Sequence, residues 1–305
     1  GGEIDEAASN STRIAFVFGG NGAQWAGMGI APYRQNPRYR KAFDLVSDCF
    51  EAPLKGEKLN ELLFADNLQE RLVDTTIAQP LLFAIQAALS DTLVASGLEP
   101  QAVYGHSVGE VAAAYCAGVL TLSEAIDVVV KRSKSQSIAS GSGKMAAVVL
   151  GAESTLQFAA RHDLHSIAVA AVNGPNSVTI AGTSEDVKAF KNAARAEHVV
   201  VQILDINYPF HHPLMEKVKP AFLADPPVIA PKNSPVAFIS AVTGAVEEGR
   251  RLDTAYWWRN LREPVLFAEA TENAIDLGCD LFIEISPRSV LTHYISEAAK
   301  QRNSS

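Results

Sequence analysis

The stretch Gly105-His106-Ser107-Val108-Gly109 decides the fold that we expect for this chain. It follows a short apolar segment at 102–104 and precedes an alanine-rich segment at 110–117, which predicts a strand, a sharp turn and a helix. Glycines two residues before and after Ser107 let the backbone pass without a Cβ clash. The serine hydroxyl then lies at a helix N-terminus, where free N–H groups can bind a developing oxyanion. The pattern predicts a nucleophilic serine, and the alternative is an ordinary glycine-containing turn.

The segments around this turn predict an α/β domain. Short apolar runs predict buried strands, and longer runs with helical spacing predict helices. Gly118 stands where a helix C-terminal cap belongs, and Thr121 with Glu124 has the spacing of a capping box at the start of a helix. We expect strands at 13–18, 102–104, 235–240 and 281–285, and helices at 76–94, 110–117, 121–134 and 254–260, with another helix from Met28 or Asn36 onward.

Residues 141–206 predict a small inserted unit. The expected order is strand 145–150, helix 154–162, strands 166–172 and 178–181, helix 184–198 and strand 199–204. This β-α-β-β-α-β order is typical of a ferredoxin-like arrangement. We therefore expect a hydrolase-like core with a parallel sheet and a nucleophile elbow, formed by 12–140 and 207–300, and flexible ends at 1–11 and 301–305.

Composition narrows the class of protein. The 305 residues carry a formal net charge of −8, and no run of five or six basic residues occurs, so neither nucleic acid nor a membrane surface is an expected partner. No stretch of about 20 apolar residues predicts a membrane span. Cys49, Cys116 and Cys279 are far apart in sequence and form no C-x-x-C motif. This pattern predicts reduced thiols in a cytoplasmic protein, with no metal site.

A serine nucleophile needs a base, and seven histidines are available. The adjacent His211 and His212 are the best candidates, because Pro209 and Pro213 stiffen their segment. His106 lies beside the nucleophile and is expected to tune the pocket. The remaining histidines, at 162, 165, 198 and 293, are less well placed. From the residues alone, either His211 or His212 remains a candidate.

Arg132 is the third candidate for chemistry. The residues three and four positions before it are Val129 and Val128, so Arg132 continues an apolar stripe and has no acidic partner one turn earlier. An arginine that points inward needs an anion. That anion is either a distant carboxylate in a structural ion pair or the carboxylate of a substrate.

These motifs together resemble the malonyl-CoA:acyl-carrier-protein transacylases, and most closely the acyltransferase domains of polyketide synthases. The resemblance covers about residues 13–296. The elbow matches the family's Gly-His-Ser-x-Gly-Glu, and Arg132 lies 25 residues after Ser107, as the family arginine does. The other similar segments are 18–25 (FGGNGAQW), 76–80 (TIAQP), 172–175 (VNGP) with 178–182, 210–213 (FHHP), and 256–265 (YWWRNLREPV).

The resemblance implies roles for particular residues. His211 takes the place of the catalytic histidine, and His212 replaces the usual serine. Backbone carbonyl groups, rather than a carboxylate, orient the histidine, and the N–H groups of Asn21 and Val108 form the oxyanion hole. The residues implied in substrate binding and selectivity are Gln24, Gln79, His106, Asn173, Tyr208, Phe210 and His212. Gly19 and Asn21 stand where the family has Pro and Gln.

The function implied is transfer of a malonyl unit from malonyl-CoA to the phosphopantetheine thiol of an acyl carrier protein, with no bound cofactor. Arg132 would hold the free malonyl carboxylate. The expected partners are the carrier protein, a ketosynthase and other domains of a polyketide synthase. Phe210 and Val108 favour malonyl, whereas Tyr208 is typical of methylmalonyl transfer. Two rival classes of protein are an esterase-type serine hydrolase, against which Arg132 argues, and a non-catalytic carrier-docking domain.

Overall fold

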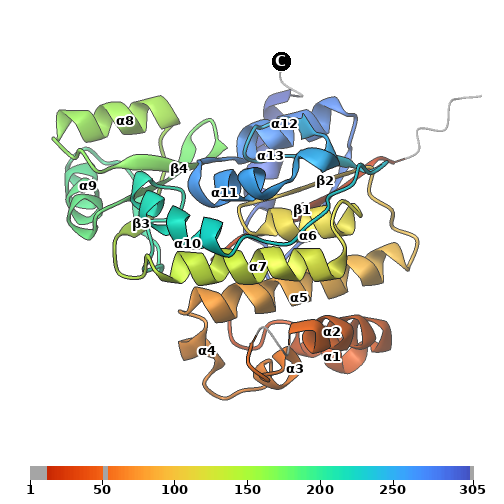
Figure 1. Cartoon of the computed structure of the whole chain (residues 1–305). Coiled ribbons are helices and arrows are strands. Elements are labelled where there is room, and N and C mark those ends of the chain that lie inside the picture. Colours follow the sequence, from red (N-terminus) through yellow and green to blue (C-terminus); the bar gives the residue numbers. More distant parts are fainter. Residues whose placement is uncertain (1–11, 51–53, 303–305) are drawn as a thin grey trace, which may run out of the picture.

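The structure is a computed structural model that describes residues 12–50 and 54–302 (Figure 1). The expected flexible end at 1–11 lies outside the described residues, as do 303–305. The last helix, α13, spans Thr292–Arg302. Residues 301 and 302 are therefore the last residues of this helix.

The larger sheet contains five strands in the order β10-β1-β2-β7-β8. The first four are parallel, whereas β8 pairs antiparallel with β7. The predicted parallel sheet is therefore mixed at this edge, because a turn through Gly244, with φ of 71°, returns the chain directly beside β7. The strands are β1 Ile14–Phe18, β2 Ala102–Gly105, β7 Ala237–Ile239, β8 Val246–Glu247 and β10 Leu281–Ile285.

Helices cover both faces of this sheet (Figure 1). Alternate residues of β1 point to opposite faces, so Phe16 and Phe18 join one apolar cluster while Ala15 and Val17 join another. This two-sided burial explains the unbroken apolar run in β1. The first face packs against α5 (Thr75–Val94), α6 (Gly109–Cys116) and α7 (Leu122–Ser137), and the second against α12 (Phe267–Asp276) and α13.

Helix α5 is long and apolar enough to pass a length and composition test for a membrane span. In an 18-residue window of this helix, however, 72% of the residues are buried inside the protein. Core helices of water-soluble folds pass the same test, so this finding is weak evidence for a span. The helix is a central core element, as its apolar residues all round predicted.

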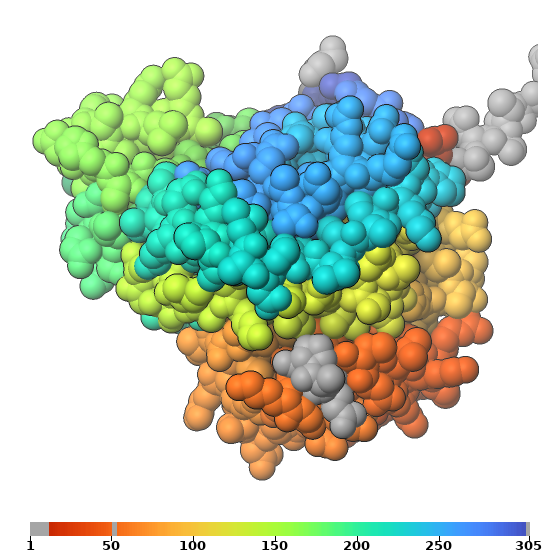
Figure 2. Space-filling view, in the orientation of Figure 1, coloured from red at the N-terminus to blue at the C-terminus, as the bar shows by residue number. Residues whose placement is uncertain are grey.

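A second sheet lies to one side and has the order β6-β3-β5-β4-β9. Figure 2 shows most of this part, in green, projecting from the rest of the molecule. Its elements follow in the predicted order, and β6, β3, β5 and β4 are antiparallel. They are β3 Lys144–Val148, α8 Ala152–Arg161, β4 Ala168–Gly174, β5 Ser177–Gly182, α9 Ser184–Ala196 and β6 Val201–Ile203.

The fifth strand of this sheet, β9 (Val265–Leu266), was not anticipated from the sequence. It comes from outside 141–206 and pairs in parallel with β4. The remaining elements are α1 Ile30–Gln35, α2 Pro37–Phe50, α3 Leu59–Leu62, α4 Leu68–Arg71, the 3-10 helices η1 Pro213–Val218 and η2 Gly249–Arg251, α10 Lys219–Ala224 and α11 Thr254–Arg262. The short strand β9 ties the two sheets together just after the loop that follows α11.

Candidate active site

Ser107 occupies a strained turn between β2 and α6. Its φ is 57°, in the left-handed region that residues with a side chain rarely adopt. A Cβ on Gly105 would lie 2.3 Å from the backbone nitrogen of Glu110, and one on Gly109 would lie 2.3 Å from the carbonyl oxygen of Phe18. The two glycines are therefore required by close backbone packing. The turn thus has the strained and closely packed geometry expected of a nucleophile elbow.

His211 is the histidine that contacts the nucleophile. Its Nε2 lies 2.7 Å from the Oγ of Ser107, and its Nδ1 lies 2.8 Å from the carbonyl oxygen of Glu263. Because a carbonyl can only accept, Nδ1 carries the proton and Nε2 is free to accept the serine proton. Burial, with Arg132 and His106 nearby, lowers the pKa of His211 to about 3, so the ring is neutral near pH 7. Like Ser107, His211 has a positive φ, of 58°.

His212 points away from Ser107. Its Nε2 lies 2.6 Å from the carbonyl oxygen of Ser166, and its Nδ1 accepts a hydrogen bond from the N–H of Leu214 at 3.0 Å. It therefore caps the start of η1 and joins this segment to the region of the smaller sheet. Within the described residues, His212 does not line the cavity above the site. The structure thus places it outside the substrate-contacting set that the resemblance implied.

Arg132 lies beside the nucleophile and is fully buried. Its Nη2 donates to the Oγ of Ser107 at 2.9 Å. Its Nη1 donates to the side-chain oxygens of Gln79 and Gln136, at 2.6 and 2.9 Å, and its Nε donates to the oxygen of Asn260 at 3.0 Å. Within the described chain no carboxylate accepts a hydrogen bond from this guanidinium, although the charge of Glu110 acts on it without direct contact. Burial lowers the pKa of Arg132 to about 9, with Glu110 opposing the shift, so the group stays cationic near pH 7.

Glu110 and Asn260 belong to this cluster, but no role for either was predicted from the sequence. The Nδ2 of Asn260 donates to the Oε2 of Glu110 at 2.5 Å and to the carbonyl oxygen of Ser107 at 3.1 Å. Both residues lay in motifs that matched the family, and that match was the available signal. Asn260 is 153 positions from Ser107 and 150 from Glu110, so no local sequence spacing could reveal that these residues are in contact.

The loop that precedes the site is tied down at both ends. The side chain of Gln86 donates to the carbonyl oxygen of Gly19 at 2.7 Å, and Arg288 donates to that of Gly22. In the part of the chain that the structure describes, the N–H groups of Asn21 and Val108 donate no hydrogen bond. Both remain available for an oxyanion, as the resemblance implied, despite the changed residues at 19 and 21.

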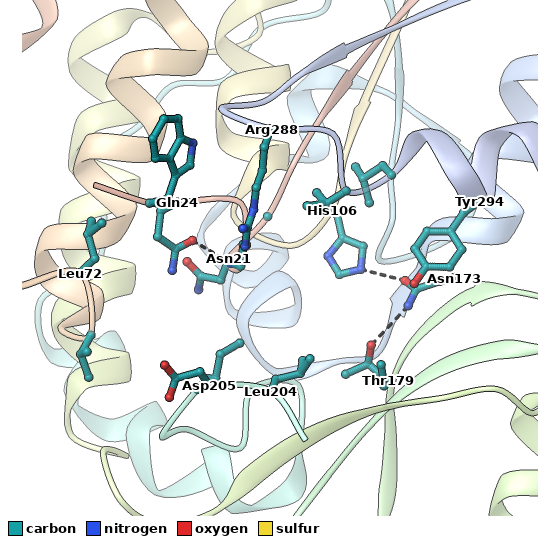
Figure 3. A pocket seen from close by; sticks show the side chains of 18 of the residues that line it. Asn21, Gln24, Leu72, His106, Asn173, Thr179, Leu204, Asp205, Arg288 and Tyr294 are labelled. Atoms are coloured by element: carbon teal, nitrogen blue, oxygen red, sulfur yellow. Dashed lines mark hydrogen bonds between the residues drawn. The ribbon is translucent and has the colours of Figure 1, made fainter. Parts of the chain in front are cut away.

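A cavity of about 500 Å³ opens above the site (Figure 3). His106 forms part of its wall, and its Nε2 lies 3.0 Å from the Oδ1 of Asn173 on β4. Burial lowers the pKa of His106. Ser107, His211 and Arg132 are not among the residues that line this cavity. The polar and aromatic residues of the lining include Asn21, Gln24, Trp25, Asn173, Asp205, Arg288 and Tyr294.

The other residues implied in selectivity fall into two groups. Tyr208 and Phe210 stack with ring centroids 4.9 Å apart and line a smaller hollow that also touches Asn21 and Gln24. The oxygen of Gln24 accepts a hydrogen bond from the N–H of Gly22 at 2.7 Å. Gln79 is buried and holds Arg132 rather than facing either hollow.

Comparison with known proteins agrees with this site. The model of the acyl transferase domain family matches residues 15–305. The chain is 38% identical over 288 residues to erythronolide synthase EryA2 of Saccharopolyspora erythraea, a match that covers 94% of this chain and 8% of that protein. It thus spans a small part of such relatives.

Solved structures lead to the same class. The acyltransferase domain from module 8 of the salinomycin polyketide synthase superposes with a TM-score of 0.90 at 32% identity, covering 95% of this chain and 68% of that chain. A loading acyltransferase from the avermectin modular polyketide synthase gives 0.89 at 33% identity, covering 95% and 92%. The chain belongs to the acyl transferase domain family, and its relatives are acyltransferase domains of polyketide synthases. The resemblance predicted from the sequence is confirmed.

Proposed function

We propose that this domain moves a malonyl unit from malonyl-CoA to the phosphopantetheine thiol of an acyl carrier protein through an acyl-Ser107 intermediate, in polyketide biosynthesis. The observation that carries this proposal is the position of Arg132. Arg132 is a buried cation that contacts the nucleophile, and all its hydrogen-bond partners are neutral, so it can still bind an anion of the substrate directly. A malonyl thioester has such an anion, in its free carboxylate, and an acetyl thioester has none.

The reaction has two steps. Ser107 attacks the thioester carbonyl while its proton passes to the Nε2 of His211, and the N–H groups of Asn21 and Val108 hold the oxyanion. The carbon–sulfur bond then breaks, and the proton from His211 goes to the departing coenzyme A thiol. In the second step the carrier thiol gives its proton to His211 and attacks the acyl-serine, and the proton returns to Ser107. The backbone carbonyl of Glu263 keeps His211 in the required tautomer throughout.

Phe210 supports malonyl over methylmalonyl as the extender unit. Its ring is locked by stacking on Tyr208 and occupies space next to the Asn21 loop, where an α-methyl group would need room. A single methyl group is discriminated by about 1–3 kcal/mol in such a pocket. Methylmalonyl transfer by the same machinery is the alternative.

We also propose the domain organisation expected from the sequence. Residues 12–140 and 207–300 would form the hydrolase-like part, and 141–206 a ferredoxin-like part, whose antiparallel order β6-β3-β5-β4 supports this division.

The partners would be a carrier protein, a ketosynthase and other synthase domains. The three free cysteines support a cytoplasmic location.

The test is a competition among equal amounts of malonyl-, methylmalonyl- and acetyl-CoA, read by intact mass and peptide mapping. We expect a malonyl adduct on Ser107 that is absent in Ser107→Ala and that shifts toward acetyl in Arg132→Ala. Arg195→Ala, which changes an exposed arginine on α9, is the control and should behave as the parent chain does. Free acid without an adduct, and without stimulation by carrier protein, would instead identify a hydrolase.

A further inference from the structure

Glu110 and Asn260 form a buried chain of contacts that ends on Arg132. The Oε1 of Glu110 accepts hydrogen bonds from the N–H of Ala241 at 2.7 Å and the hydroxyl of Tyr256 at 2.9 Å. Its Oε2 accepts from the Nδ2 of Asn260, and the Oδ1 of Asn260 accepts from the Nε of Arg132. Glu110, Asn260 and Arg132 are each at most 2% exposed. From Glu110 to Arg132 the hydrogen-bonding groups therefore follow a fixed order: the Glu110 carboxylate accepts, the Asn260 nitrogen donates, and the Asn260 oxygen accepts from the guanidinium.

The two ends of an asparagine amide have nearly the same size but opposite polarity. Steric fit therefore cannot decide which end of Asn260 faces Arg132. Turning the amide over would set an N–H₂ group against the Nε–H of Arg132 and an oxygen against the carbonyl of Ser107. An ionised Glu110 can only accept, as can the carbonyl of Ser107, so Glu110 adds the shorter of two bonds that hold the nitrogen on this side and leave the oxygen for Arg132.

We propose that Glu110 and Asn260 are positioning residues that select for the substrate carboxylate: ionised Glu110 fixes the orientation of the Asn260 amide, and the amide fixes Arg132. This inference rests on the proposed role of Arg132 in holding that carboxylate. The guanidinium is planar, so holding Nε through Asn260 and Nη1 through Gln79 and Gln136 fixes the direction of Nη2. Nη2 is the nitrogen that contacts Ser107, beside which the substrate must lie.

The arrangement makes the selection depend on pH. The titratable groups that face Glu110 are Tyr256 on α11 and Arg132 on α7. Burial raises the pKa of Glu110 to about 7, against the opposing effects of its hydrogen bonds and of Arg132. Since Oε1 already accepts two hydrogen bonds, a proton is added at Oε2, which faces Asn260. A donor there opposes the Nδ2 of Asn260, so the amide loses its bond to Glu110 and holds the Nε of Arg132 less firmly. Below about pH 7, the preference for malonyl over acetyl should therefore decline.

The experiment measures kcat/KM for acylation of Ser107 by malonyl-CoA and by acetyl-CoA, with the whole domain, between about pH 6 and pH 8.5. The unmodified domain should lose malonyl preference as the pH falls, while acetyl transfer changes little. Glu110→Gln places a donor opposite Asn260 and should reduce the malonyl rate about tenfold or more at every pH, because hydrogen bonds to charged groups are lost. Acetyl transfer should change much less.

Two further variants separate polarity from packing. Tyr256→Phe removes a hydrogen bond that lowers the pKa of Glu110, so the loss of malonyl preference should begin at higher pH. Glu110→Asp keeps an ionised acceptor on this side of Asn260 without placing a carboxylate on Arg132, and should recover part of the malonyl preference that Glu110→Gln lost. A purely structural role for Glu110 predicts no recovery.

The outcomes are distinct. A malonyl preference that is flat across this pH range, or unchanged in Glu110→Gln, overturns the inference. If Glu110→Gln melts early and accepts no acyl group, the pH profile of the unmodified domain decides. If the unmodified domain forms no malonyl adduct at any pH, the proposed function has failed instead.

Discussion

The strained backbone at Ser107 should be measurable as lost stability. We expect Ser107→Gly to be more stable than Ser107→Ala, although both variants lack the hydroxyl and both are inactive. An L-residue in the left-handed region costs about 1–2 kcal/mol, from which the greater unfolded-state freedom of glycine subtracts about 0.5–1 kcal/mol. With φ of 57° at this position, the net gain of the glycine variant should be about 0.5–1 kcal/mol. For a chain of 305 residues, this corresponds to about 1–2 °C in Tm.

Differential scanning calorimetry of the two variants under identical conditions gives this difference directly. Ser90 on α5 supplies the matched control, because it is a buried serine within a right-handed helix. There the order should reverse, with Ser90→Gly less stable than Ser90→Ala by about 1 kcal/mol. Equal Tm values for the two Ser107 variants, or a less stable Ser107→Gly, would refute the argument that the elbow stores backbone strain.

Three further predictions concern the same site. Gly109→Ala should lower the free energy of unfolding by about 1–3 kcal/mol and slow acylation, because the new Cβ would lie 2.3 Å from the backbone of β1. Denaturant titration measures the first effect and the rate of adduct formation the second. A variant with unchanged stability and rate would contradict the packing. His211 has a folded-state pKa of about 3 against an ordinary value of 6.5, so its contribution to stability is present above about pH 6.5 and is lost as the pH falls toward 3. Between about pH 7 and pH 5, the unfolding free energy of the unmodified domain should therefore fall by about 2 kcal/mol relative to that of His211→Asn. Parallel profiles of unfolding free energy against pH for the two proteins would contradict this. Phe210→Ala should raise the methylmalonyl share of the adduct about tenfold in the competition assay, and an unchanged share would remove Phe210 as a selector.

Local chemistry in the sequence was enough to locate the elbow and most of the elements. The glycines at 105 and 109 marked a turn that only a residue without Cβ permits, and the packing distances bear this out. The pair Thr121 and Glu124 predicted a capping box, which is present at the start of α7. The unbroken apolar run of β1 predicted a buried strand, and the structure buries it on both faces. Each of these signals depends on residues close together in the chain, where periodicity and turn chemistry act.

The partners of the reactive groups were decided by the tertiary structure. Ser107 and His211 are 104 positions apart, and Arg132 and Asn260 are 128 apart. The residues alone left His211 and His212 as equal candidates, and the fold turned one ring to Ser107 and the other to Ser166. The sequence by itself thus determined the family and which residues are candidates for its chemistry. Only the fold determined which of their atoms meet, because hydrogen bonds in a buried site depend on orientations that no local pattern encodes.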